Sequence, residues 1–194
     1  MYPNRQKAEQ ILNEAKILND GPWIEHSKNV AKVASIIAKY SKMDEDKAYV
    51  FGLLHDIGRR FGDASIAHAL YGYLYLSQMG YDEAAKVCLT HSFNTKKTED
   101  YHGKIDLKND TIKRIQDALD DLDYDDYDKL IQLSDSIADH NGLIDQEERM
   151  KDVENRHGGY SSSRKKKNRE LKAYFEEKIG QNIYKLINNE MIRM

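Results

Sequence analysis

The sequence predicts an all-α protein, and two observations support this prediction. The chain of 194 residues contains only two prolines, Pro3 and Pro22, and no useful run of alternating apolar and polar residues. Apolar residues instead recur at intervals of three and four, which is the spacing of one face of an α-helix. With 40% hydrophobic residues, a chain of this length can form one domain with its own core.

Breaks in the apolar pattern separate the expected helices. Asp20-Gly21-Pro22 interrupts the first pattern, and Pro22 suits the first turn of the helix that follows. Gly58 and Gly80 end two later helices. The expected helices cover residues 6–18, 22–40, 44–56, 64–79, 82–92, 125–139 and 170–193.

Two segments lack helical periodicity and are expected to be irregular. Residues 93–110 predict a long polar loop, a kind of segment that is often a functional lid. Residues 155–169 are rich in Gly, Ser and basic side chains and predict a break before the last helix. An N-terminal helix (residues 1–21), a core (22–140) and a C-terminal helical extension (141–194) should form one globular domain.

Charge and cysteine content limit the classes of partner and compartment. The formal net charge of −3 gives no global basic field, so a nucleic-acid partner is not expected. The basic run at 164–169 is interpreted as a charged linker, with contact to RNA or an acidic partner as the alternative. A single cysteine, Cys88, fits a small core residue in a reducing compartment. No apolar run approaches a membrane span, and we expect a cytoplasmic protein; a homodimer is left open.

The stretch from Val50 to Arg60, VFGLLHDIGRR, places His55 and Asp56 at the end of an apolar run. Burying an imidazole and a carboxylate costs several kcal/mol unless each finds a partner. A metal ion satisfies both groups, because neutral histidine nitrogen and carboxylate oxygen are ordinary metal ligands. The simpler alternative is a hydrogen bond between the two side chains at a helix end.

Four further polar residues lie among apolar neighbours on other expected helices: His26, His68, His91 and Asp135. A lone histidine on an apolar face is usually a hydrogen-bonded core residue, and a lone aspartate there is rarer. Six such side chains on five helices are better explained by one shared polyvalent partner than by six separate core contacts.

The ordered set His26, His55-Asp56 and Asp135 resembles the signature of the HD superfamily of metal-dependent phosphohydrolases. HDIG followed by a basic residue, here Arg59, is a frequent form of its central motif. The resemblance covers roughly residues 22–140 and agrees with the all-α prediction.

His68 and His91 resemble the two additional histidines of the subgroup that binds two metals, in which Asp56 would bridge the ions. The resemblance implies one metal held by His26, His55, Asp56 and Asp135, and a second held by Asp56, His68 and His91. Mixed His and carboxylate ligands favour divalent or mixed-valent iron or manganese over structural zinc.

The activity implied by the resemblance is hydrolysis of a phosphoester or phosphoanhydride in a nucleotide or other small phosphate compound, through a metal-activated water. Asp56 and Arg59 are the expected catalytic residues. Substrate phosphate is expected to contact Arg59, Arg60, Lys96 and Lys97, because cations match phosphate oxygens. His102, His140 and His157 lie in polar contexts and are expected to be exposed, although His140 is close enough to Asp135 to line a pocket.

Two other functions remain open at this point. The segment from His68 to Lys97 resembles two-iron oxygenases of this fold in its spacing, so an enzyme that activates O2 on a small phosphonate or polyol is one alternative. A non-catalytic helical binding module is the other. Diadenosine tetraphosphate hydrolases share the six-ligand arrangement, but their segments around the histidines are only loosely similar. Relatives that cleave cyclic dinucleotides carry a Gly-Tyr-Pro motif, whereas Ser92-Phe93 follows His91 here. The natural substrate therefore stays open.

Overall fold

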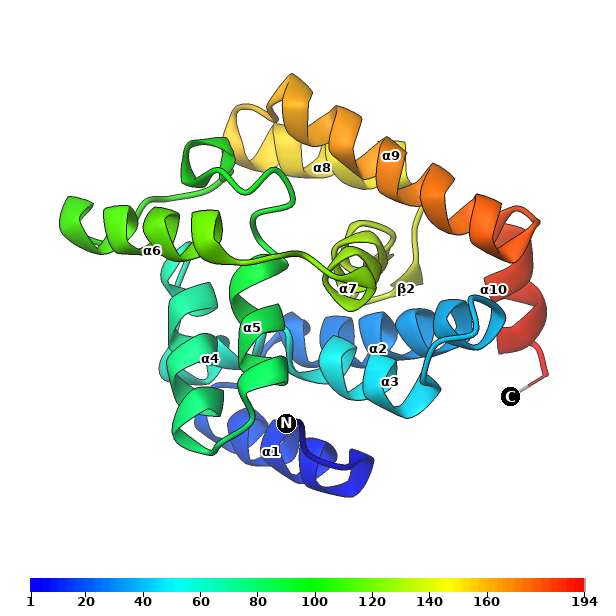
Figure 1. Cartoon of the computed structure of the whole chain (residues 1–194), viewed down its shortest axis with the longest axis horizontal. Coiled ribbons are helices and arrows are strands. Elements are labelled where there is room, and N and C mark those ends of the chain that lie inside the picture. The colour runs from blue at the N-terminus through cyan, green and yellow to red at the C-terminus, as the bar shows by residue number, and fades with distance from the viewer. Residues whose placement is uncertain (194) are drawn as a thin grey trace.

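The computed structural model describes residues 1–193, except the side chain of His157, and confirms the all-α fold (Figure 1). Its α-helices are α1 (Arg5–Leu18), α2 (Pro22–Tyr40), α3 (Glu45–Leu54), α4 (Ala67–Gln78), α5 (Asp82–Thr90), α6 (Asn109–Asp121), α7 (Asp126–Ser136), α8 (Gln146–His157), α9 (Ser162–Ile179) and α10 (Ile183–Met191). The short elements are the 3-10 helices η1 (Ile57–Phe61) and η2 (Thr98–Asp100) and the strands β1 (Ala138–Asp139) and β2 (Gly142–Leu143).

Helix α2 lies at the centre of the main core and contacts α3, α7, α9 and α10 (Figure 1). Its approach to α3 is unusually close at Gly52, where a Cβ atom would lie 2.7 Å from the Cα atom of Ala31. The absent side chain therefore lets α2 and α3 meet backbone to backbone and hold the end of α3 firmly against the core. Cys88 on α5 is fully buried, as expected for a small core residue.

A second apolar cluster joins α4, α5 and α6 on one side of the molecule (Figure 1). The sequence prediction did not include α6, which follows the irregular segment 93–108. Ile115 and Leu119 of α6 are buried against Ile66 and Phe93. This helix fixes the far end of the long loop, so the loop is anchored on both sides.

The C-terminal region differs from its prediction in three ways. The expected break at 155–169 is confined to residues 158–161, between α8 and α9, and α8 itself was not predicted. Gly158 adopts a left-handed φ of 77° that ends α8, and Ser161 caps α9 by accepting a hydrogen bond from the amide of Arg164. The basic run 164–169 therefore lies inside a helix. Gly180, with φ 70°, divides the single helix expected at 170–193 into α9 and α10.

The layers of the fold set the position of the candidate site. Figure 1 shows α7 between the α2–α3 layer and the pair α8–α9, which crosses the opposite side. Within residues 1–193, no helix combines the length and apolar character needed to cross a bilayer.

Candidate metal centre

The turn that carries His55 and Asp56 is held by a close contact between η1 and α4. A Cβ atom on Gly58 would lie 1.9 Å from the backbone oxygen of His68 and 2.5 Å from the backbone nitrogen of Gly72. Only glycine fits this contact, because either distance is far below van der Waals contact. The glycine of the HDIG motif thus brings α4, and with it His68, next to Asp56.

The structure brings together all six residues that the sequence singled out as metal ligands. The Nε2 atom of His26 lies 3.0 Å from Oδ1 of Asp135. On the other side of the cluster, Oδ1 of Asp56 lies 3.1 Å from Nε2 of His68 and 3.5 Å from Nε2 of His91. His55 lies between them, with its Nε2 atom 3.9 Å from a carboxylate oxygen of each aspartate.

Two compact groups of donor atoms occur within this cluster. In each group, the donor atoms lie within 4.8 Å of one another. One consists of His26, His55 and Asp135, and the other of His55, Asp56 and His91. His55 belongs to both groups, and His68 completes the second through its contacts with Asp56 and His91.

Backbone carbonyl groups orient three of the imidazoles in the same way. The Nδ1 atom of His55 lies 2.7 Å from the carbonyl oxygen of Gly52, and that of His91 lies 3.3 Å from the carbonyl of Val87. His68 makes the same contact with the carbonyl of Ser65. A carbonyl oxygen only accepts, so each Nδ1 carries the proton and each Nε2 presents a lone pair to the cluster.

The protonation states suit a cation. Burial lowers the pKa of His68, and it lowers that of His55 to about 4, so both rings are neutral near pH 7. Burial alone would raise the pKa of Asp56, but Arg59 and His68 outweigh it and hold that pKa well below its usual range. His26 and His55 likewise lower the pKa of Asp135 against the effect of burial. Neutral imidazoles and ionised carboxylates are the donor set that divalent metals bind.

An unpartnered buried atom gives a second sign of fit. The Nε2 atom of His55 is buried and has no hydrogen-bond partner among the residues that the structure describes. An orphaned buried acceptor costs about 1–3 kcal/mol, which a bound metal would relieve. The cluster therefore fits one or more divalent cations, and a hydrogen bond closing a helix end does not account for it.

A cavity of about 320 Å³ lies over the cluster. Its described lining includes two aspartates, Asp56 and Asp135, and four arginines: Arg59, Arg149, Arg156 and Arg164. Arg59 lies beside the donor atoms, because its Nε atom donates to Oδ2 of Asp56 at 2.7 Å. Even with both carboxylates ionised, the arginines leave a positive excess, which favours an anionic ligand.

The other expected phosphate contacts lie elsewhere. Arg60 stacks over the ring of Tyr75, with its guanidinium carbon 4.0 Å from the ring centroid. Lys96 donates to the carbonyl of Leu122, and Lys97 lies 3.7 Å from Glu99 at the surface. Among the described residues that line the cavity, none of these three cations is found.

Two of the remaining histidines line the cavity. His140 is exposed at its rim, as expected. His102 is only half-buried rather than fully exposed, because Ser161 donates its backbone amide to His102 Nε2 at 2.7 Å and the Tyr160 ring lies against it. The expectation for the His157 side chain lies outside the described residues.

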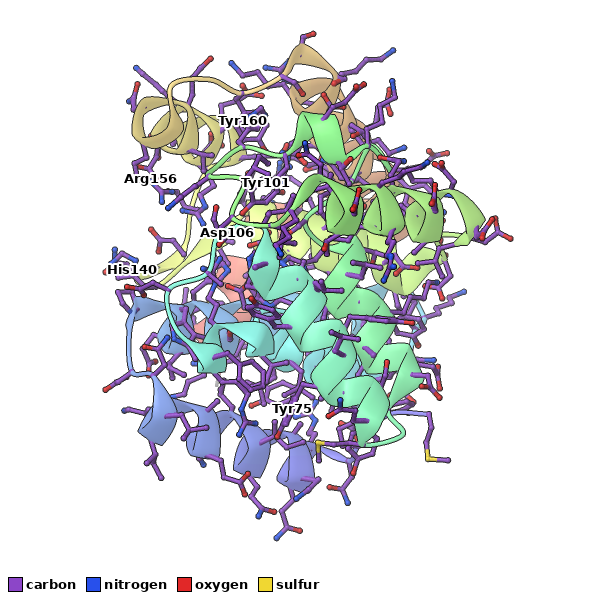
Figure 2. All side chains as sticks on the ribbon, turned by 90° about the vertical axis from the view of Figure 1, so that its left-hand side faces the viewer. Tyr75, Tyr101, Asp106, His140, Arg156 and Tyr160 are labelled. Atoms are coloured by element: carbon purple, nitrogen blue, oxygen red, sulfur yellow. The ribbon has the colours of Figure 1, made fainter. Side chains whose placement is uncertain are left out.

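The arginines of the C-terminal helices were not predicted from the sequence as part of the site. Arg149 and Arg156 are seven residues apart on α8, with Val153 between them, so the three share one helix face. Arg156 is held by Asp152, one turn earlier, at 2.8 Å. Figure 2 shows Arg156, Tyr101 and His140, from three separate segments, on the same side of the molecule. The seven-residue spacing of Arg149 and Arg156 could have indicated that they share a helix face, but only if α8 had been predicted to be a helix.

A known protein family matches the core of the chain. No curated protein and no solved structure matches the sequence. The HD domain family model matches residues 23–139, more than half of the chain, and this span contains all six clustered His and Asp residues. Arg149, Arg156 and Arg164 lie beyond it. Since this family model covers most of the chain and the helices bring its His and Asp residues together, the chain belongs to the HD domain family, whose members are in general metal-dependent hydrolases.

Proposed function

We propose that this protein is a metal-dependent phosphohydrolase that cleaves a phosphoester or phosphoanhydride of a nucleotide or another small phosphate compound. One observation carries the proposal: a single cavity combines a metal-binding cluster of His and Asp with four arginines. The cluster alone supports metal chemistry of several kinds. The arginines add the preference for phosphate, because a guanidinium fork matches phosphate oxygens.

The ligand assignment is the one that the family resemblance implies. It differs from the two compact groups of donor atoms by adding Asp56 to the first, adding His68 to the second and assigning His55 to the first ion alone. His26, His55, Asp56 and Asp135 would hold one metal, and Asp56, His68 and His91 would hold the second. Iron and manganese are the expected metals, given the mixture of imidazole and carboxylate. Such metals lower the pKa of bound water and stabilise negative charge on the oxygens of a reacting phosphoryl group.

Arg59 is proposed to orient both Asp56 and the substrate. Its Nε–H donates to Asp56, and Nη1 lies 3.3 Å from the carbonyl oxygen of Ala64. A guanidinium has five N–H groups, so the two contacts leave others for phosphate oxygens at the cavity floor. The Asp56 bond also fixes one carboxylate oxygen, which leaves Oδ1 directed toward His68 and His91.

Arg149, Arg156 and Arg164 are proposed to hold the outer phosphate oxygens. All three come from α8 and α9, whereas Arg59 comes from η1 in the HDIG turn. A phosphate group bound between them would be contacted from two sides. This placement would attract the anionic substrate and fix its orientation over the donor atoms.

The proposal is tested by phosphate release without oxygen. Protein loaded anaerobically with Mn²⁺ or Fe²⁺ is incubated with nucleotides, sugar phosphates and simple phosphate esters. We expect phosphate release from at least one compound, loss of release with chelator, and loss of both metal and release in Asp56→Ala. Full metal occupancy with no release from any compound would refute the proposal. Turnover that needs O2 would instead support an oxygenase.

A further inference from the structure

A small chamber of about 80 Å³ adjoins the main cavity on the side of α7 and α9. The two spaces share His91, Asp135, Arg149 and Arg164 in their linings. The part that belongs to the chamber alone carries three carboxamide side chains: Asn94, Gln132 and Asn168. The chamber is therefore positioned to receive a group attached to whatever is bound over the metal cluster.

The carboxamide of Gln132 has a fixed direction. Its Nε2 atom donates to the backbone carbonyl of Thr90 at 3.0 Å. Because two oxygen atoms would face each other if the amide were reversed, this contact decides which end is nitrogen. The Oε1 atom is left buried with no hydrogen-bond partner among the described residues, in a side chain that is only 3% exposed.

Asn94 presents a second unpartnered acceptor. Its Nδ2 atom donates to Oδ1 of Asn168 at 2.6 Å, and Nδ2 of Asn168 lies 2.8 Å from the hydroxyl of Tyr160. The Oδ1 atom of Asn94 is buried and has no partner in the described part of the chain. Asn94 is 4% exposed, so both orphaned acceptors are more than nine-tenths buried.

The chamber residues also include an unpartnered hydrogen-bond donor. The Nε atom of Arg164 is also buried without a hydrogen-bond partner within residues 1–193, and Arg164 lines the chamber. Residues that line the chamber thus carry two unpartnered acceptor atoms and one unpartnered donor atom. Hydroxyl groups both donate and accept, so a group with two neighbouring hydroxyls satisfies this set better than an amine or a second phosphate. An apolar group would leave these buried polar atoms unpaired, which disfavours its binding.

We infer that the chamber binds a hydroxylated part of the substrate's leaving group, so that the preferred substrates are phosphate esters of sugars or polyols. This inference rests on the proposed function and names the substrate class of the same site. The volume supports a small group: at roughly 30 Å³ per water molecule, the chamber has room for about three waters, and covalently bonded atoms pack more closely than separate waters. A hydroxymethyl or vicinal diol fits that space, whereas a purine ring does not.

A matched pair of ligands tests the inference without turnover. Butylphosphonate and 3,4-dihydroxybutylphosphonate differ only in two hydroxyl groups, and hydrolysis cannot cleave their C–P bond. We expect the dihydroxy compound to bind the anaerobic Mn²⁺-loaded protein roughly tenfold to a hundredfold more tightly in calorimetry. Equal affinity, tighter binding of butylphosphonate, or no binding of either would overturn the inference.

A substitution in the chamber tests whether the chamber causes the tighter binding of the dihydroxy phosphonate. In Gln132→Leu the difference between the two phosphonates should fall to within a factor of about three, because the acceptor is removed. Gln78→Leu, at an exposed position of α4, is the matched control and should keep the full difference. If the two phosphonates differ in affinity for Gln132→Leu as much as they do for the wild type, the chamber does not bind the hydroxyl groups. Should that variant fail to fold, the wild-type pair still decides the matter.

The outcome separates this inference from the proposed function. Phosphate release from glycerol 3-phosphate and from propyl phosphate is measured in parallel. If both esters release phosphate at similar rates and the two phosphonates bind equally well, the proposed hydrolase activity is supported and the inference that the chamber binds hydroxyl groups is refuted. If the dihydroxy phosphonate binds more tightly but no ester releases phosphate, the proposed hydrolase activity is refuted and the inference that the chamber binds hydroxyl groups is supported.

Discussion

The Nε2 atoms of His68 and His91 lie 3.1 Å apart, although both rings direct Nδ1 to a backbone carbonyl group. Each Nε2 therefore presents a lone pair to the other, and Oδ1 of Asp56 lies within 3.5 Å of both. The hydroxyl of Ser92, at 3.0 Å from one and 3.3 Å from the other, has one proton and satisfies only one of them. Three acceptors converging in a buried space repel one another unless a cation lies between them.

Metal binding should therefore stabilise the fold. A ligand bound only by the native state at 100 times its dissociation constant adds about 2.7 kcal/mol. For a chain of this size that corresponds to a rise in Tm of roughly 5–10 °C. The measurement is thermal unfolding with and without Mn²⁺ after chelation. His91→Ala should show a smaller rise than the wild type, and an equal rise would argue against His91 as a ligand.

Arg59→Ala should impair substrate binding while metal stays bound. The guanidinium contacts Asp56 from the cavity side, and the donor atoms that face the metal cluster are left in place. We expect KM to rise at least about tenfold, as for loss of a charge-assisted contact to phosphate. Metal content by emission spectrometry should stay near that of the wild type, whereas His55→Ala should lose metal. Arg59→Lys should recover only part of the loss, because a lysine lacks the planar fork.

The six clustered residues were predictable because each breaks a simple rule. A His or Asp on an apolar helix face needs a partner, and the HDIG motif adds order and spacing to that signal. The geometry could not be predicted. The contact between Gly58 and the backbone of His68 depends on how η1 packs against α4, which no local pattern specifies.

Helix α6 and the arginines of α8 were missed for a different reason. Ile112, Ile115 and Leu119 do follow helical spacing, but charged neighbours dilute this signal, and the burial that stabilises α6 comes from α4 and α5. An arginine on a polar helix is ordinarily a solvated surface residue. Arg156 becomes part of the cavity only because α8 folds back across the HD core.

Arg156→Met should weaken binding of phosphate compounds without removing metal. Arg156 lines the rim of the cavity, half exposed, so its contribution should be modest. We expect KM to rise about threefold to fivefold at low salt, with the difference shrinking as salt screens the charge. Arg169→Met, on α9 and paired with Glu147 outside the cavity, is the matched control. Equal effects of the two substitutions on KM would mean that the net charge of the protein, not the rim position, matters.

Gly58→Ala should damage both the fold and the metal centre. The added Cβ would overlap the backbone of α4, and a backbone cannot move aside as a flexible side chain does. We expect a loss of roughly 2–4 kcal/mol in the free energy of unfolding, together with weaker metal binding as His68 moves away from Asp56. Denaturant unfolding and metal titration are the measurements. Gly159→Ala, where a Cβ meets no atom within 4 Å, should leave both near the wild-type values.

Asp126 should make the packing of α7 against α9 dependent on pH. Partial burial would raise its pKa, but hydrogen bonds from Lys178, Tyr174 and Lys129 outweigh that effect and lower it to about 2. A depressed pKa means that the ionised carboxylate stabilises the folded state above its unfolded pKa of about 3.9, and that this contribution is lost as pH falls toward 2. Asp126→Asn should therefore lower the stability by about 1 kcal/mol or less at pH 7, and the difference from wild type should vanish near pH 2. Urea unfolding across this range is the measurement, with Asp117→Asn, an exposed carboxylate on α6, as the control. A difference that persisted unchanged at pH 2 would show that the hydrogen bonds of Asp126, and not its charge, hold the two helices together.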